Sequence, residues 1–163
     1  MPRIELKTYI ETRDIKRVFD LCRSIDLHIL STERSNEKAI AGKTSGLISL
    51  GETVTWRAKH LGIYQTLTSI VTDCDSPTFF ADEMVKGAFK NFRHEHYFSQ
   101  EEDSVIIKDV FEYKSPLGII GKFVDFLFLK NYMKRFLVER NQVIKEHAET
   151  DKWKDILSLN EGS

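Results

Sequence analysis

Residues 122–149 contain neither proline nor glycine, and this stretch restricts the fold more than any other part of the chain. Because those two residues interrupt helices, the stretch predicts one long helix that begins near Gly118 or Lys122 and ends near Glu149. The first half of this helix is apolar almost all round, which exceeds what contact with one sheet requires. The second half is mostly polar, and residues 140–147 are expected to be exposed charge.

The segment before this helix predicts a series of strands. Polar and apolar residues alternate in GETVTWRAKH, which places Val54, Trp56 and Ala58 on one face. Four further segments are rich in β-branched and aromatic residues and are expected to be strands, at 63–74, 78–87, 91–100 and 104–114. The connections between them are short and polar, which indicates an antiparallel meander rather than parallel βαβ units.

The N-terminal part predicts one strand and two short helices. The pattern of RIELKTYI at 3–10 is typical of a strand. Asp14 is expected to cap a helix, because the apolar residues that follow it recur at helical spacing. A second helix is expected to begin at Ser24 or Asp26, and a strand is expected at 38–42.

The composition excludes several classes of protein. Lys and Arg number 24 and Asp and Glu number 25, so a broad phosphate-binding face is excluded and nucleic acid is not an expected partner. Two cysteines, Cys22 and Cys74, fit neither a disulfide scaffold nor a four-cysteine zinc site. The N-terminus lacks the apolar core of a signal peptide, and no run of about 18 apolar residues exists. We therefore expect a cytoplasmic protein without a membrane span.

The order of elements and several motifs resemble one known superfamily. The stretch 51–141 is similar to START-like (SRPBCC) ligand-binding proteins, and particularly to bacterial proteins named polyketide cyclase/dehydrase-like. The motifs that carry the resemblance are GETVTWRAKHLG at 51–62, PTFF at 77–80, GAF at 87–89, FRHEHYF at 92–98, Asp109, Glu112-Tyr113, PLG at 116–118, Arg135 and Arg140.

This resemblance implies an α+β helix-grip fold. In that fold a strongly curved antiparallel sheet wraps around a long C-terminal helix, and two short helices follow the first strand. Residues 1–149 are expected to form a single START-like ligand-binding domain, followed by a loosely ordered tail at 150–163. The resemblance is specific for the fold, but it is weak for function because the superfamily includes transporters, hormone receptors and cyclases.

Strand alternation predicts a polar cluster inside the sheet. His94 and His96 share a face with two phenylalanines, so both imidazoles are expected to point inward. Asp109 shares a face with apolar and aromatic residues of the last strand, and Glu52 shares the face of Trp56. The strands that carry the histidines and Asp109 are neighbours in a helix-grip fold, which would bring these polar groups together.

Several interpretations fit this cluster. The first is a hydrogen-bonded core network, and the second is a polar patch that recognises a ligand. The third is an acid–base pair in which a carboxylate holds a histidine. His-x-His could also supply two metal ligands, with Asp109 or Glu52 as a third. Since no other residues have metal-ligand spacing, neither a metal nor a cofactor is expected. The candidate catalytic residues are His94, His96 and Asp109.

The expected function is to bind a small hydrophobic molecule, such as a lipid, a polyketide-like compound or an isoprenoid. The cavity would lie between the curved sheet and the C-terminal helix, although aromatic side chains could also fill it. Its expected ligand-binding residues are Glu52, Trp56, Phe92, His94, His96, Phe98, Asp109, Phe111, Phe123 and Leu127.

Two other functions stay open at this point. The first is a cyclase, dehydratase or isomerase that uses His94, His96 and Asp109 as acid and base groups. The second is an interaction module, because Val124 and Phe128 lie on an apolar stripe of the long helix that the sheet does not need. That stripe could form a homodimer, or dock on a partner or a membrane surface.

Overall fold

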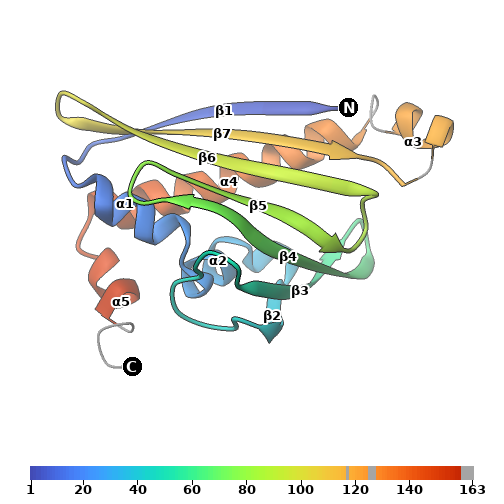
Figure 1. The fold of residues 1–163 in the computed structure, drawn as a ribbon, viewed down its shortest axis with the longest axis horizontal. Helices are drawn as coiled ribbons and strands as arrows, with labels where there is room; N and C mark the ends of the chain where they lie inside the picture. Colours follow the sequence, from blue (N-terminus) through green and yellow to red (C-terminus); the bar gives the residue numbers. More distant parts are fainter. Residues whose placement is uncertain (117, 125–127, 159–163) are drawn as a thin grey trace.

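Seven antiparallel strands form a curved sheet in the computed structural model, which describes residues 1–116, 118–124 and 128–158. The strands follow the order β1-β7-β6-β5-β4-β3-β2, so the first strand pairs with the last and the rest form a meander (Figure 1). Their bounds are β1 Arg3–Ile10, β2 Lys38–Gly42, β3 Thr53–His60, β4 Ile63–Asp75, β5 Phe79–Lys86, β6 Asn91–Glu101 and β7 Ser104–Lys114.

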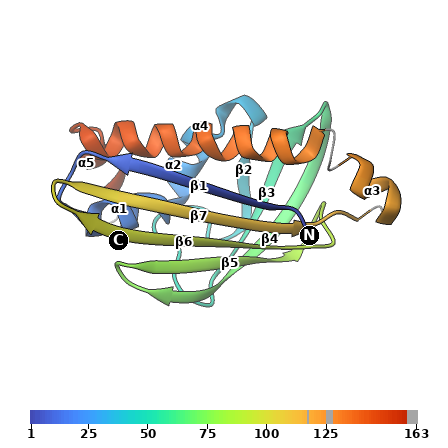
Figure 2. The same cartoon turned by 90° about the horizontal axis from the view of Figure 1, so that it is seen from above.

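Helices cover one face of this sheet. Figure 2 shows the longest helix, α4, running along that face. Two short helices, α1 and α2, lie between β1 and β2 in the chain, followed by the 3₁₀ turn η1. The bounds are α1 Ile15–Cys22, α2 Ile25–Ser31, η1 Glu33–Ser35, α3 Gly118–Val124, α4 Lys130–Glu149 and α5 Trp153–Leu157. Among the described helices, none has the length and apolar character needed to cross a membrane.

Local capping explains where the two short helices begin. The Asp14 carboxylate accepts a hydrogen bond from the backbone N–H of Arg17 at 2.9 Å. The Ser24 hydroxyl accepts one from the N–H of Leu27 at 3.2 Å. Both residues satisfy a donor that the first helical turn leaves without a partner.

Alternation along the strands fixes which side chains face the helices. On β6, Phe92, His94, His96 and Phe98 are buried, whereas the residues between them are partly or fully exposed. On β3, Val54, Trp56 and Ala58 are buried in the same way. The buried faces meet α1, α2 and α4 in three apolar clusters, and a cavity lies among these clusters.

The stretch expected to form one long helix contains two described helices, α3 and α4, and residues 125–127 between them lie outside the described residues. α3 lies beyond the end of the sheet (Figure 2). Phe123 on α3 is 66% exposed, so the expectation that it lines the cavity is wrong. The physical reason is its position, because the strands that the structure describes end before that helix (Figure 2). Leu127 lies outside the described residues.

Part of the expected loose tail packs on the rest of the domain. Trp153–Leu157 forms α5, where Ile156 is buried in the same cluster as Phe19 of α1. The guanidinium of Arg17 lies over the ring of Trp153 at 4.2 Å, which joins α5 to α1. The expectation of a loose tail is therefore wrong for this segment.

Candidate binding site

A cavity of about 140 Å³ lies between the sheet, α2 and α4. β3, β4, β5, β6 and β7 supply one wall, and α4 closes it with Met133, Phe136 and Leu137. Most of the lining is apolar, as is usual for sites that bind small molecules. The aromatic rings that line it are Trp56, Phe80, Phe89, Phe92, Phe111 and Phe136.

One wall of the cavity is polar, and Asp109 lies directly behind it. The Asp109 carboxylate lies 3.0 Å from Nε2 of His94, and both side chains are buried. The same carboxylate oxygen lies 2.7 Å from Nδ1 of His96, although the contact is off the line of a hydrogen bond. The two imidazole rings lie next to each other, with their centroids 3.9 Å apart.

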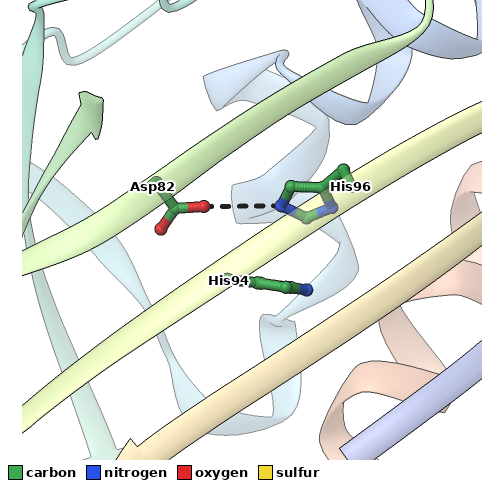
Figure 3. Close-up of side chains that lie close together, drawn as sticks. All are labelled: Asp82, His94 and His96. Carbon is green, nitrogen blue, oxygen red and sulfur yellow. Dashed lines mark hydrogen bonds and ion pairs between the residues drawn. The ribbon is translucent and has the colours of Figure 1, made fainter. Parts of the chain in front are cut away.

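Asp82 completes this wall from the neighbouring strand. The pairing of β5 with β6 places Asp82 opposite His94. Figure 3 shows the Asp82 carboxylate directed toward His96, whose Nε2 lies 3.4 Å from it. The side chain of Asp82 keeps 22% of its surface accessible, and it lines the cavity together with both histidines.

Two buried polar residues of α4 support Asp109 from the other side. The amide of Asn141 donates a hydrogen bond to Asp109 at 2.5 Å. The guanidinium of Arg140 donates to the Asn141 side-chain oxygen at 3.1 Å and to the carbonyl of Cys22 at 3.0 Å. Arg140 also lines the cavity. The expectation that 140–147 is exposed charge is therefore wrong for Arg140 and Asn141, because their polar groups find partners in the interior, whereas Gln142 and Glu146 are exposed.

A second polar pair lies at the α2 side of the cavity. Nε2 of His28 lies 3.3 Å from the carboxylate of Glu37, which is buried. The His28 ring lies against Trp56, with centroids 4.3 Å apart. All three side chains line the cavity, so its polar groups lie on two walls with aromatic rings between them.

Burial and neighbouring groups set the charges of the polar wall. Burial lowers the pKa of His94 to about 4, and His96 beside it acts in the same direction. Burial also disfavours a charge on His96, but its contacts with Asp109 and Asp82 outweigh burial and raise the pKa of His96. Burial alone would raise the pKa values of both carboxyls. The histidines instead hold the pKa of Asp109 well below its usual value and lower that of Asp82.

The structure brings most of the expected site residues together. Five of them line the cavity directly, namely Trp56, Phe92, His94, His96 and Phe111. Asp109 lies immediately behind the two histidines. Phe98 is buried against Phe19 and Phe80 in a core cluster beside the cavity.

Glu52 does not join the polar cluster. It lies before β3, where its carboxylate accepts a hydrogen bond from the N–H of Ser49 at 2.8 Å and lies 3.8 Å from Lys43. The expectation that it faces inward is wrong, because strand alternation does not extend into the turn that contains Glu52.

Sequence reasoning missed Asp82, Glu37, Arg140 and Asn141. A signal existed for Asp82, since it is two residues from the buried Phe80 and therefore on the same strand face. A signal also existed for Asn141, which continues the helical spacing of Leu137 and Ile144. Glu37 precedes a short strand, and its position gave no comparable signal.

The arrangement can recognise a ligand that is apolar over most of its surface. Such a ligand would contact the aromatic walls and place a hydroxyl or carboxylate against His96 or Arg140. A histidine held by a carboxylate is also the arrangement that general acid–base catalysis uses.

Comparison with solved structures identifies the fold. No protein-family model matches the sequence, and no curated protein matches it either. The protein TTHA0849 from Thermus thermophilus superposes with a TM-score of 0.74 at 14% identity, over 90% of this chain and 97% of that one. A START superfamily protein from Mycobacterium smegmatis gives 0.68 at 10% identity, with the same coverage of both chains.

A plant protein has the same architecture. Major latex-like protein 151 from Panax ginseng superposes with a TM-score of 0.67 at 15% identity, over 90% of this chain and 97% of that one. These likenesses confirm the predicted helix-grip fold, and the chain is similar in structure to START superfamily and major latex-like proteins.

Proposed function

We propose that this protein binds a small, mostly apolar molecule in the cavity between the sheet and α4. The observation that carries the proposal is the cavity itself, whose aromatic lining leads to a wall of four polar side chains. These are Asp82, His94, His96 and Arg140. An apolar chamber with a few convergent polar groups binds a ligand in one orientation, because only one end of the ligand can satisfy the polar groups.

The volume of the cavity limits the size of the ligand. An engineered protein cavity of about 150 Å³ binds benzene, so about 140 Å³ accommodates roughly one aromatic ring. A longer isoprenoid, polyketide-like compound or lipid would require Met133, Phe136 and Leu137 of α4 to move outward. We therefore propose a single-ring compound with one hydroxyl or carboxylate as the ligand that fits without rearrangement.

The fold supports the same class of function. START-like proteins generally bind hydrophobic ligands between their sheet and their C-terminal helix, and the cavity of this protein lies in the corresponding place. The open volume of about 140 Å³ favours ligand binding over a completely filled core.

Trp56 provides a direct test, because it lines the cavity whereas the other tryptophan, Trp153, packs on α1. In a Trp153→Phe variant, the tryptophan fluorescence, excited selectively over the tyrosines, comes from Trp56 alone. Titration with phenol, benzoate, 1-naphthol and palmitate should give a saturable change in emission for at least one single-ring compound.

A matched pair of substitutions locates the binding. Val71→Phe places a ring in the cavity wall, whereas Val85→Phe makes the same change at an exposed position of β5. Val71→Phe should weaken binding by about tenfold or more, equivalent to about 1.4 kcal/mol, and Val85→Phe should leave it unchanged. A folded Trp153→Phe protein whose emission responds to none of the four compounds would overturn the proposal.

A further inference from the structure

Three side chains of the polar wall have the composition and spacing of a metal site. Asp82 comes from β5, and His94 and His96 come from β6 (Figure 3). One ligand atom from each of the three residues lies within 4.8 Å of the others. Two imidazoles and one carboxylate form a donor set that zinc and neighbouring transition metals use, whereas magnesium and calcium prefer oxygen donors.

One of the three distances between ligand atoms has the value that a tetrahedral ion requires. Two ligand atoms that each lie about 2.1 Å from a tetrahedral zinc lie roughly 3.4 Å from each other. Nε2 of His96 lies 3.4 Å from the carboxylate oxygen of Asp82. This pair is long for a hydrogen bond but has the separation that a shared metal ion would impose.

Asp109 provides the outer contacts that metal-bound histidines need. Its carboxylate lies 3.0 Å from Nε2 of His94 and 2.7 Å from Nδ1 of His96. Asp109 thus holds His94 at Nε2, which leaves Nδ1 for a metal. His96 has Nδ1 beside Asp109, off the line of a hydrogen bond, and Nε2 toward Asp82. A carboxylate behind the histidine orients the ring and increases the basicity of the ligating nitrogen. The hydrogen bond from Asn141 fixes Asp109 in turn.

Charge and access complete the argument. The Asp82 and Asp109 carboxylates together compensate the charge of a divalent ion when both imidazoles are neutral. The charge of Arg140 opposes the ion, but its guanidinium is held by Asn141 and the Cys22 carbonyl. Asp82, His94 and His96 all line the cavity, so a fourth coordination position would open into it.

We propose that Asp82, His94 and His96 bind a divalent transition-metal ion of the zinc class, with Asp109 as the residue that positions both histidines. The open fourth position would take water or the polar group of a cavity ligand. This proposal goes beyond ligand binding and does not require it.

The test uses the full-length protein after treatment with a chelator. Calorimetric titration with Zn²⁺ should give one site per chain, and Co²⁺ should give the visible absorption bands of a four-coordinate ion. Asp82→Asn keeps the shape of the side chain but removes the charged ligand, so it should weaken Zn²⁺ binding by about 100-fold. His96→Gln should have an effect of similar size.

Two further variants separate the roles of the residues. Asp109→Asn should weaken binding by about 10–100-fold and keep a stoichiometry of one, because Asp109 only positions the ligands. His60→Gln removes an imidazole that contacts Tyr132 and Phe136 rather than the cluster, and it should leave affinity unchanged. Thermal unfolding of each variant checks that it is folded.

Two results would overturn the metal site. One is that the folded wild-type protein binds neither ion with one-site stoichiometry. The other is that Asp82→Asn and His96→Gln bind Zn²⁺ as the wild type does. If the wild type binds neither metal ion but the emission of Trp56 still responds to phenol, only the metal site is overturned. The proposed ligand binding is unaffected, because the fluorescence titration contains no metal.

Discussion

Asp109 is the residue on which the polar wall of the cavity depends. It contacts His94, His96 and Asn141, and it is almost completely buried. Alternation along two strands predicts that Asp109 and both histidines face inward, and the structure places all three there. Alternation was enough to predict the inward direction of these side chains, because each strand has one apolar face that the core must cover.

Asp82 shows that alternation along a strand does not predict which residues of the neighbouring strand lie beside a side chain. Its importance comes from the register that places it opposite His94. Buried and partly exposed residues do not alternate regularly along β5, and its pairing with β4 contains register shifts. The neighbours of Asp82 therefore could not be derived from the sequence.

Glu37 leads to a prediction about pH. Burial alone would raise the pKa of this carboxyl, but His28 and His60 near it and the Thr32 hydroxyl outweigh burial and lower it. A lowered pKa in the folded state means that the carboxylate stabilises the protein above its unfolded pKa of about 4.3. That contribution is lost as the pH falls through the lower, folded value.

The substitution Glu37→Gln should therefore destabilise the protein at pH 7 by about 1–3 kcal/mol, because a buried charged hydrogen bond is lost. The difference from wild type should shrink as the pH falls below about 4. Urea unfolding at pH 7 and at a pH below about 4 measures the difference in unfolding free energy between the variant and the wild type. Glu33→Gln, at an exposed position in η1, is the control and should change little. An equal loss at both pH values would contradict this account.

At the scale of elements, α3 and α4 show where the sequence pattern misled. The absence of proline and glycine predicts helix, and most of the stretch is helical. The absence of these two residues does not determine whether the whole stretch forms one straight helix. Ile119, Ile120 and Phe123 of α3 and the nearby Phe128 are exposed. The homodimer expected through this apolar region stays a prediction.

The buried face of α4 also mixes polar with apolar residues. Leu137, Asn141, Ile144 and Ala148 recur at helical spacing and are buried together with Arg140. Polar residues on a helix are usually exposed, and that rule misplaced Arg140 and Asn141. Their burial depends on partners from β7 and α1 that only the fold supplies.

The packing of α5 gives a prediction at this scale. Ile156→Ala should destabilise the protein by about 2 kcal/mol, because Ile156 is buried in the cluster shared with α1 and α4. Lys154→Ala on the same helix, whose side chain is 57% exposed, is the matched control and should change stability little. The measurement is the free energy of unfolding in urea. Equal effects of the two substitutions would mean that α5 does not pack on the core.

For the whole molecule, the sequence pattern predicts strands with short connections, two capped helices and one long C-terminal helical stretch. The resemblance of their order and motifs to START-like proteins implies the helix-grip fold, which the solved structures confirm. The volume of the cavity could not be predicted in this way. It depends on the rotamers of large side chains such as Phe89, Phe92 and Phe136, and on how α4 lies across the sheet.

We propose that the cavity, rather than the exposed apolar surface of α3, binds the apolar ligand. The most direct measurement is NMR of methyl-labelled protein during titration with phenol. Binding in the cavity should give shifts and contacts to phenol at the methyl groups that line it, which belong to Ile48, Val54, Leu67, Val71 and Leu137. Perturbations confined to Ile119 and Ile120, with the cavity methyl groups unchanged, would contradict it.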